Sequence, residues 1–405
     1  MLKKLSWLLV FAGLTLWLAP LGHAQFTNPS VNISNSAMDS KFPKICHLAG
    51  GSTELVVWVE TDGTTDYLYF AKSTNGAVTW STPFQLSTNG QILEHSEDIG
   101  DYCAFNMEVA DPYVHIVIQW RDNSSDDWDI WYLRSVDLGD TWDLWVALTN
   151  NSYESQFPDV ATAGDYVHVT YQDDWPGNRE IMYKRITNYG GGAVDQTRRL
   201  TFSSGNSYYP KIAVRESGYC VSVVYEDDTS GYYNVYYKHV DNYGAGSYET
   251  KQLTFGSTVG DWNGLPDIAV GTGSYDAYVY IVYQAFWPGN REVMYKRLDN
   301  YGFGAFNTYT ARLTYSTTVS TSNAIDWDTI YDYVHISYQD DWPGNNDIMY
   351  RKLSSGGGAG FTSQRVSWGT GDSSSSTVAA SGAWAYVVWA DDSSGNYEIY
   401  VKKGY

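Results

Sequence analysis

The sequence contains few of the residues that could cross-link a fold covalently or hold a metal ion. Only 3 of its 405 residues are cysteine, at positions 46, 103 and 220. An odd number of cysteines in an exported chain leaves at least one thiol free or bonded to another chain, so a disulfide scaffold is excluded. No cysteine and histidine residues have the spacing of a zinc site. We therefore predict no cofactor and no metal, and the pairing of Cys46, Cys103 and Cys220 is left open.

Positive charge is also scarce. Lysine and arginine total 25 against 46 aspartate and glutamate residues, which gives a formal net charge of −21. Such a chain repels the phosphates of nucleic acids and the surface of anionic bilayers, so we expect neither as a partner. A strongly acidic balance is typical of soluble exported proteins and of proteins that bind cations.

Long apolar runs are absent after the first 18 residues. The chain starts with Lys3 and Lys4, an apolar run over residues 5–18 and a small-residue site at Gly22-His23-Ala24. This order is that of a secretory signal peptide, and the run is too short for a convincing membrane span. We predict a cleaved signal peptide over residues 1–24, and a secreted or periplasmic protein without membrane insertion.

No stretch shows helical periodicity, and the chain instead repeats itself. Three segments nearly coincide: YQDDWPGNREIMYKR from Tyr171, YQAFWPGNREVMYKR from Tyr283 and YQDDWPGNNDIMYRK from Tyr338. Weaker copies begin at Trp58, Trp120, Tyr225 and Trp389. In every copy an aliphatic residue stands ten positions after the first aromatic one, at Leu68, Ile130, Ile181, Val235, Val293, Ile348 and Ile399. Seven copies of one spacing indicate a repeat protein.

Each repeat is interpreted as four short strands. In the third copy the pattern predicts strands over 157–161, 166–172 and 180–186, and a fourth that begins at Arg199. Units of about 50 residues with four strands each predict an all-β, seven-bladed β-propeller of four-stranded antiparallel blades. The seventh unit lacks its fourth strand, so we predict that an N-terminal strand at residues 31–34 completes the last blade and closes the ring. Residues 25–405 are thus expected to form a single domain.

A motif between the third and fourth strands connects the repeats to a known family. Ser135 to Trp142 matches the Asp-box pattern S-x-D-x-G-x-T-W at every fixed position, and Ser73 to Trp80 is a looser copy. The chain therefore resembles the Asp-box propellers, or bacterial neuraminidase repeat propellers, of the sialidase superfamily. The resemblance covers essentially all of the chain after the signal peptide. It implies fold rather than activity, because in that family the box forms a turn opposite the catalytic face.

The resemblance does not extend to the residues of sialidase catalysis. Sialidases of this family hold the substrate carboxylate with three arginines, the first in a Phe-Arg-Ile-Pro-like motif. The nearest segment here, Phe42-Pro43-Lys44-Ile45, lacks that arginine. We predict a non-sialidase member without assigned catalytic residues; a glycan-active enzyme, either an exo-sialidase-like hydrolase or a polysaccharide lyase, is the alternative. A lyase would need a histidine or tyrosine as its base. His95, His115, His168 and His335 are present, but the last three recur at one strand position, which indicates packing.

The turns between the second and third strands are the strongest candidates for ligand binding. We predict that Trp175, Trp287 and Trp342 are exposed platforms for sugar rings or for a partner surface. The adjoining polar residues complete the candidate site: Asn178, Arg179, Asn290, Arg291, Asn345 and, without an equivalent in other repeats, Arg121. The Pro-Gly pair in these turns predicts a type II turn with Pro and Gly at its centre. The connections between repeats add Tyr208, Tyr209, Asp261, Trp262, Asn263 and Trp327.

Paired aspartates in the same turns suggest calcium as an alternative ligand of these turns. They are Asp173-Asp174, Asp227-Asp228, Asp340-Asp341 and Asp391-Asp392. Oxygen ligands suit Ca²⁺, but no loop has the spaced carboxylates of a dedicated site, so turn capping is the simpler interpretation. The sequence as a whole predicts a secreted, non-catalytic, monomeric propeller that binds glycans or extracellular proteins through its loops. A cell-surface scaffold without a small ligand is a further alternative.

Overall fold

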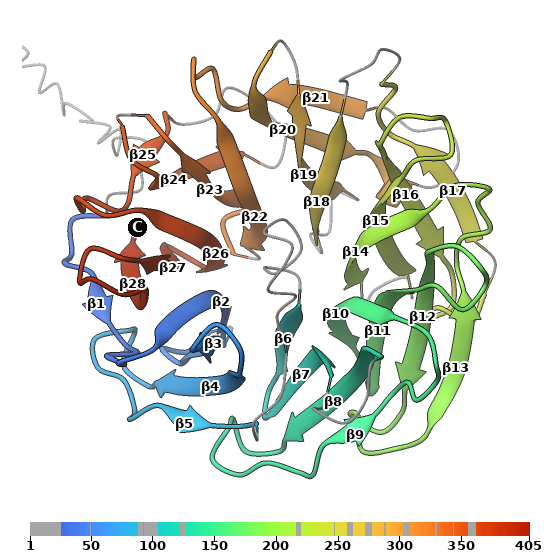
Figure 1. The fold of residues 1–405 in the computed structure, drawn as a ribbon, viewed down its shortest axis with the longest axis horizontal. Coiled ribbons are helices and arrows are strands. Elements are labelled where there is room, and N and C mark those ends of the chain that lie inside the picture. Colours follow the sequence, from blue (N-terminus) through green and yellow to red (C-terminus); the bar gives the residue numbers. More distant parts are fainter. Residues whose placement is uncertain are drawn as a thin grey trace, which may run out of the picture.

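The computed structural model describes residues 26–405, apart from 49, 88–91, 93–103, 122–126, 216–219, 247, 257–261, 272–277, 287–288, 303–307, 329, 343 and 355–361. The described residues form seven four-stranded antiparallel sheets arranged around a central axis (Figure 1). This arrangement confirms the predicted seven-bladed propeller. The predicted signal peptide lies outside the described residues. Among the residues that are described, no helix has both the length and the apolar character needed to cross a bilayer.

The strands of the first six blades run outwards in chain order, so the first strand of each lines the central axis and the fourth lies on the rim; in the seventh blade the N-terminal strand takes the rim position. The strands, grouped from the first blade to the seventh, are β2 (Asp39–His47), β3 (Glu54–Thr61), β4 (Asp66–Ser73) and β5 (Phe84–Gln85); β6 (Phe105–Ala110), β7 (Tyr113–Trp120), β8 (Asp129–Ser135) and β9 (Val146–Ala147); β10 (Ser155–Ala163), β11 (Tyr166–Asp173), β12 (Glu180–Ile186) and β13 (Val194–Arg199); β14 (Ser207–Arg215), β15 (Cys220–Asp227), β16 (Asn234–Val240) and β17 (Tyr248–Gln252); β18 (Asn263–Val270), β19 (Val279–Phe286), β20 (Arg291–Leu298) and β21 (Thr308–Arg312), with a 3-10 turn at Asn300–Gly302; β22 (Ser320–Asp328), β23 (Tyr333–Asp340), β24 (Asp347–Ser354) and β25 (Gln364–Arg365); and β26 (Ser373–Ser381), β27 (Trp384–Asp391), β28 (Glu398–Gly404) and β1 (Val31–Asn32).

The last blade joins the two ends of the chain, as predicted. Its strand order is β1-β28-β27-β26, so an N-terminal strand supplies the missing rim strand. Val31 pairs with Val401, and the backbone N–H of Ile33 donates to the carbonyl of Ile399 at 2.8 Å. Ring closure therefore depends on a few residues next to the predicted signal peptide.

Two details of the predicted repeat are wrong. The fourth strand of the third blade, β13, ends at Arg199 rather than beginning there, and Leu200 is buried behind it. In the second blade Gln119 pairs with Ile130 as Gln172 pairs with Ile181 in the third, so Ile118 rather than Trp120 occupies the repeat's aromatic position. The turn after β7 is longer than its equivalents in the other blades. Trp120 therefore lies ten residues before Ile130 although it is not the counterpart of the other aromatic residues.

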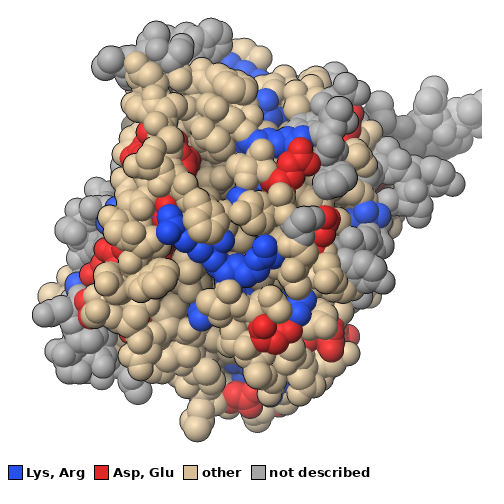
Figure 2. All heavy atoms as spheres, turned by 90° about the vertical axis from the view of Figure 1, so that its right-hand side faces the viewer, with Lys and Arg blue, Asp and Glu red and all other residues tan. Residues whose placement is uncertain are grey.

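Charge is unevenly distributed over this acidic chain. Figure 2 shows lysine and arginine side chains gathered on the rim of the third and fourth blades. On this rim, Arg198 of β13 donates from Nη1 to the carbonyls of Gly244 at 2.7 Å and Gly246 at 2.8 Å. Arg198 thus links the third blade to the fourth, and the positive charge of this rim is in part structural.

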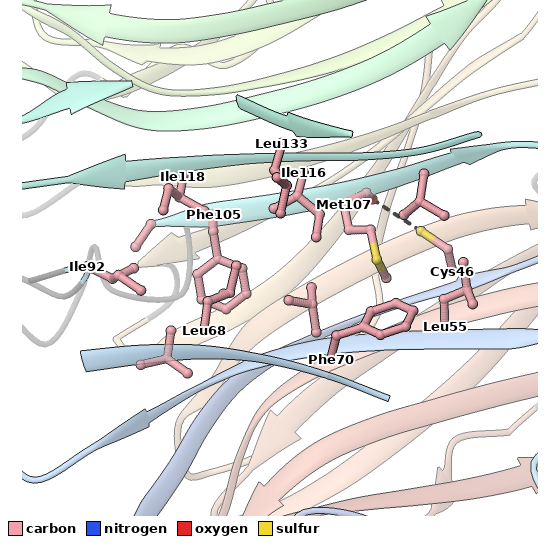
Figure 3. Close-up of a cluster of buried hydrophobic side chains, with 14 residues drawn as sticks. Cys46, Leu55, Leu68, Phe70, Ile92, Phe105, Met107, Ile116, Ile118 and Leu133 are labelled. Carbon is pink, nitrogen blue, oxygen red and sulfur yellow. Dashed lines mark hydrogen bonds between the residues drawn. The ribbon is translucent and has the colours of Figure 1, made fainter. Parts of the chain in front are cut away.

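The core is a ring of apolar layers, one at each junction between blades. Figure 3 shows the layer between the first and second blades, where Leu68 and Phe70 of β4 face Phe105 and Ile116. Equivalent clusters fill the other six junctions among the described residues. Because each sheet is covered on both faces, strands such as β3 are buried along their whole length.

A buried histidine–tyrosine pair recurs within these junctions. His168 Nδ1 lies 2.7 Å from the Tyr183 hydroxyl, which donates in turn to the carbonyl of Tyr243 in the next blade at 3.0 Å. The pairs His115–Tyr132 and His335–Tyr350 have the same 2.7 Å separation. Burial, reinforced by nearby cations, lowers the pKa of all three histidines to about 3, so they stay neutral. The repeated histidines are packing elements, as their periodic recurrence indicated.

A glycine contacts this pair from the neighbouring blade. Gly244 has φ +80°, and a Cβ atom there would lie 2.1 Å from the Tyr183 hydroxyl oxygen. We expect Gly244→Ala to lower the free energy of unfolding by about 3 kcal/mol, measured by urea denaturation, because it adds both backbone strain and overlap. Gly177→Ala is the control, since Gly177 has φ +100° but no atom within 4 Å of such a Cβ. Equal losses in the two variants would show that the contact with Tyr183 contributes nothing.

Candidate ligand-binding surface

The turns between second and third strands and the connections between blades lie at the same end of the propeller, here called the loop face. The segment that matches the Asp-box lies at the opposite end, because it connects β8 to β9. In that segment Asp137 accepts hydrogen bonds from the backbone N–H of Thr141 at 2.7 Å and from its hydroxyl at 2.6 Å. The box therefore stabilises its own turn and does not contribute to the loop face.

The paired aspartates of the loop face hold each turn to the connection that enters the same blade. Asp173 is buried and accepts from the Ser155 hydroxyl at 2.8 Å and from the backbone N–H of Trp175 at 2.7 Å. Asp174 accepts from the backbone N–H of Glu154 at 2.9 Å. The pairs at 227–228, 340–341 and 391–392 make the same contacts. The carboxylate oxygens thus accept hydrogen bonds from protein N–H and hydroxyl groups, which favours turn capping over calcium binding.

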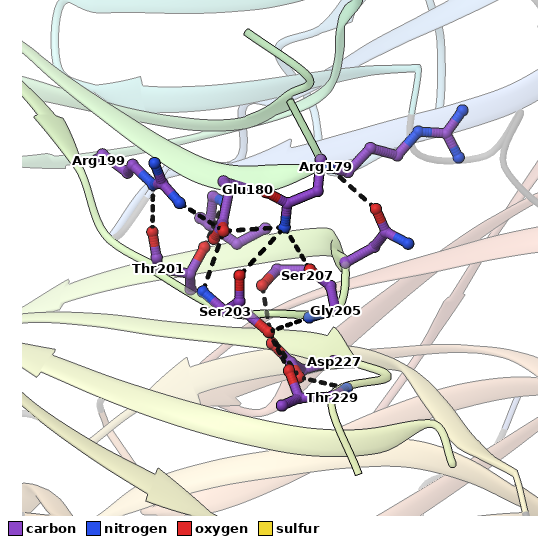
Figure 4. Close-up of polar contacts among 12 residues, drawn as sticks. Arg179, Glu180, Arg199, Thr201, Ser203, Gly205, Ser207, Asp227 and Thr229 are labelled. Carbon is purple, nitrogen blue, oxygen red and sulfur yellow. Dashed lines mark hydrogen bonds and ion pairs between the residues drawn. The ribbon is translucent and has the colours of Figure 1, made fainter. Parts of the chain in front are cut away.

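The predicted asparagines hold the turn to the connection that leaves the blade. Asn178 Nδ2 donates to the carbonyls of Ser203 at 3.3 Å and Gly205, and Figure 4 shows this region. Asn290 Nδ2 donates to the carbonyls of Ser316 and Thr318. In the sixth blade Asn345 Nδ2 donates to the carbonyl of Gly371 at 2.6 Å. The amide nitrogens of all three residues are therefore committed to backbone carbonyls.

The predicted tryptophans are exposed, and they stand at the centre of their turns. Trp175 is 57 % exposed and Trp342 is 64 % exposed. The backbone N–H of Gly177 donates to the carbonyl of Asp174 at 2.9 Å, so Trp175 and Pro176, not Pro176 and Gly177, are the central residues. The expected turn is thus shifted by one residue. Trp287 lies outside the described residues, and Trp175 and Trp342 belong to the third and sixth blades, so the ring does not bring those two together.

The predicted arginines stack on aromatic rings of the loop face. The guanidinium carbon of Arg179 lies 5.6 Å from the Tyr208 ring centre, that of Arg291 lies 5.0 Å from Trp262, and that of Arg121 lies 4.7 Å from Trp128. Burial, helped by Tyr233 and Asp228, raises the pKa of Tyr208 to about 12. The hydroxyl of Tyr208 therefore stays protonated at neutral pH.

One of the weaker candidates differs from expectation. Trp327 is buried in β22, close to the end of the strand that faces away from the loop face, and its Nε1 donates to Asp332 at 3.0 Å. It packs between the fifth and sixth blades and is not part of a connection. Asp261 lies outside the described residues. Tyr208, Tyr209, Trp262 and Asn263 lie on the loop face as expected.

A row of exposed aromatic residues was missed in the sequence. Four consecutive blades end in an apolar residue, a hydroxyl residue and an aromatic residue, and the aromatic side chains are 66–75 % exposed: Phe202, Phe255, Tyr315 and Trp368. The repeated triplets Leu-Thr-Phe, Leu-Thr-Phe, Leu-Thr-Tyr and Val-Ser-Trp are the signal that could have revealed them.

Three of these rings rest on arginines that buried carboxylates hold in place. Arg199 pairs with Glu180 at 2.7 Å, and its guanidinium carbon lies 4.6 Å from the Phe202 ring centre. The same arrangement is found at Glu292–Arg312–Tyr315 and Asp347–Arg365–Trp368. The rings are thus supported on one side and open to solvent on the other, as binding platforms require.

Clefts open beside two of these rings, at equivalent places between blades. A cleft of about 350 Å³ between the fourth and fifth blades is lined by Phe255, Trp262, Tyr283 and Phe286. A second, of about 210 Å³, lies between the sixth and seventh blades and is lined by Trp368, Trp389, Tyr400 and Lys402. In the repeat, Phe255 is equivalent to Trp368 and Tyr283 is equivalent to Trp389, so the two clefts lie at equivalent positions and have equivalent aromatic residues in their linings. We call them the interblade clefts.

A separate cavity of about 350 Å³ occupies the central channel. The inner strands carry Asp159, Asp267 and Asp326 into it, and each accepts a backbone N–H from the following blade. Glu108 also lines the channel, and burial, with the nearby Asp326 and Asp159 carboxylates, raises its pKa to about 8. Glu108 and Asp326 occupy the same repeat position in their blades. The first blade has Cys46 at this position and the remaining blades have alanine, so the two acids depart from the repeat.

Comparisons with known proteins support the fold. No family model and no curated protein sequence matches the chain. Among solved structures, an ulvan lyase of polysaccharide lyase family PL25, bound to -[GlcA(1-4)Rha3S]-, is similar with a TM-score of 0.60 and 12 % identity over 92 % of this chain and 95 % of that one. The GH93 α-L-arabinofuranosidase of Fusarium graminearum with arabinobiose has a TM-score of 0.53 and 11 % identity over 94 % and 98 %. At such identities the likeness shows the propeller architecture alone.

Proposed function

We propose that this protein is an exported, non-catalytic propeller that binds glycans at several sites, and that these sites are the interblade clefts. The observation that carries the proposal is the repetition of an aromatic-lined cleft at two equivalent junctions of the loop face. A binding protein can use several equal sites, because linked weak contacts multiply in avidity. An enzyme concentrates different catalytic groups in one place.

The composition of the clefts suits a sugar better than a protein surface. Aromatic faces can cover the apolar face of a sugar ring while nearby polar groups contact its hydroxyls. The exposed rings of Phe202, Phe255, Tyr315 and Trp368 come one to a blade, so they do not form the continuous apolar core of a protein interface. Sites at regular intervals around a ring match the repeated units of a polysaccharide.

A glycan array with the mature protein tests the proposal, followed by titration of the best ligand. We expect Phe255→Ala with Trp262→Ala to weaken binding to an immobilised glycan more than 10-fold, and Trp368→Ala added to it to abolish binding. Tyr331→Ala is the control, because Tyr331 is 57 % exposed at the opposite end of the propeller, between β22 and β23. Undiminished binding by the triple variant would refute the interblade clefts as the sites.

The turn tryptophans remain a separate prediction. Replacing Trp175, Trp287 and Trp342 together by alanine is expected to reduce binding on the same array if those side chains extend the clefts. If only the cleft variants lose binding, the turn tryptophans are not part of the site.

The central channel favours a second candidate function, that of a glycan-active enzyme. Carboxyl groups with raised pKa values, such as Glu108 and Asp326, are typical of general acids and bases. Incubation with neutral and uronate-containing polysaccharides, followed by assay of new reducing ends and unsaturated products, tests this candidate. Product formed by the native protein but not by Glu108→Gln would replace the non-catalytic proposal.

A further inference from the structure

Three metal-ligating side chains meet at the end of the fourth blade that faces away from the loop face. A ligand atom from each of Cys220, His239 and Asp241 lies within 4.8 Å of the other two. Cys220 begins β15, His239 lies in β16, and the register that pairs Val221 with Val240 places Cys220 opposite Asp241. The geometry points to a binding site for a divalent transition metal ion, and Zn²⁺ suits this set of ligands best. The site is independent of the proposed glycan binding.

The other blades use these positions differently. In the third, fifth, sixth and seventh blades, the residue equivalent to Cys220 is aromatic and the residue equivalent to His239 is a cation stacked on it. The pairs and their cation-to-ring distances are Arg185 over Tyr166 (4.2 Å), Arg297 over Tyr278 (4.1 Å), Lys352 over Tyr333 (4.6 Å) and Lys403 over Trp384 (4.0 Å). The fourth blade thus replaces both members of a packing contact by side chains that bind zinc.

The three side chains are close to the arrangement that an ion needs. Ligands at about 2.0–2.3 Å from a tetrahedral ion lie roughly 3.3–3.8 Å from one another, so small rotations would close the site. His239 is buried, and its Nε2 lies 2.9 Å from Asp241 Oδ1, so an ion would replace this hydrogen bond by its own bonds to the two side chains. Three protein ligands leave a fourth position of the ion for water or another small ligand.

Charge balance favours a divalent ion at this place. A bound divalent ion would favour the thiolate of Cys220, and the charges of that thiolate and of the Asp241 carboxylate together would balance the ion. The guanidinium of Arg215 is stacked 3.8 Å from the Tyr301 ring centre.

Cobalt titration of the reduced mature protein tests the site without any glycan. We expect one equivalent of Co²⁺ to produce a sulfur-to-cobalt charge-transfer band in the near ultraviolet, and Zn²⁺ to displace it. Cys220→Ser is expected to abolish the band, and His239→Gln to weaken Co²⁺ binding at least 10-fold. Zn²⁺ should raise the melting temperature of the native protein but not that of Cys220→Ser, whose circular dichroism reports whether it is folded.

Two matched variants keep this test specific. Cys46 is buried between the first two blades, where its thiol donates to the carbonyl of Met107 at 3.1 Å, and Cys103 lies outside the described residues. Cys46→Ser and Cys103→Ser are expected to keep the charge-transfer band. A band that persists in folded Cys220→Ser, or the lack of any thiolate band in the native protein, would overturn the proposal.

Discussion

Ile33→Asp is expected to open the propeller ring and to lower the free energy of unfolding by at least about 3 kcal/mol. Ile33 is 5 % exposed and packs with Val56, Trp58 and Val401 in the layer between the seventh and first blades. An aspartate there would place an unpaired charge in an apolar layer and would remove the side chain that anchors β1. Denaturant unfolding followed by tryptophan fluorescence measures the change.

Polar contacts next to Ile33 explain why the effect should be large. Glu398 accepts hydrogen bonds from the Ser34 hydroxyl and from the backbone N–H of Ser36 at 3.1 Å, and Ile399 N–H donates to the Ser34 hydroxyl at 2.8 Å. If β1 leaves β28, the buried Glu398 carboxylate loses these donors at the same time. The closing strand and the last blade are thus expected to unfold together.

Thr27→Asp is the matched control for this prediction. Thr27 is exposed and precedes β1, so the same charge is introduced without a change in the core. An Ile33→Asp protein with the unfolding midpoint of the control would show that ring closure contributes little to stability, and that the other junctions hold the propeller by themselves.

Stability is expected to fall by about 1–3 kcal/mol as the pH rises from 6.5 to 8. Burial raises the pKa of Glu108 and Glu226 to about 8 and that of Asp326 to about 7. In the folded protein these carboxyls hold their protons up to about their raised pKa values, whereas in the unfolded chain they have already released them near pH 4. The folded state therefore binds more protons, and each rise in pH favours unfolding.

The buried histidines set the lower limit of this window. His115, His168 and His335 stay neutral in the folded protein down to about pH 3, whereas the unfolded chain protonates them below about pH 6.5. Their contribution to stability is present above pH 6.5 and is lost as the pH falls. Between about pH 4.5 and 6.5 this loss opposes the effect of the buried carboxyls, so we expect the highest stability near pH 5, measured as the unfolding free energy in urea at several pH values.

Glu108→Gln isolates the contribution of the channel. The amide has the shape of the protonated acid but cannot ionise, so we expect this variant to be more stable than the native protein at pH 8 by more than about 1 kcal/mol, with little difference at pH 5. Asp165→Asn is the control, because Asp165 is exposed between β10 and β11. An unchanged pH dependence in Glu108→Gln would show that Glu108 ionises normally in the folded protein.

The positions of the candidate residues were only partly predictable. Exposure of Trp175 and Trp342 followed from a turn whose capping aspartates lie one or two residues away, so the relevant contacts are local. The roles of Asn178 and Asn290 were not predictable, because their partners are carbonyls more than 20 residues further along the chain. Trp327 was misplaced because the composition of a strand end resembles that of a connection.

The architecture of this protein follows from its repeat pattern. A strand pattern repeated seven times, with the missing strand at the other end of the chain, specifies seven blades and their closure, because strand periodicity and turn chemistry act between near neighbours. Which side chains lie together in one site depends on the tertiary structure. Phe255 meets Phe286 across a blade junction, Glu108 and Asp326 approach across the channel, and Cys220 meets His239 across a hairpin. The first two contacts depend on how the sheets are arranged around the axis, and the third depends on the register of two paired strands; the spacing of residues along the chain does not specify either.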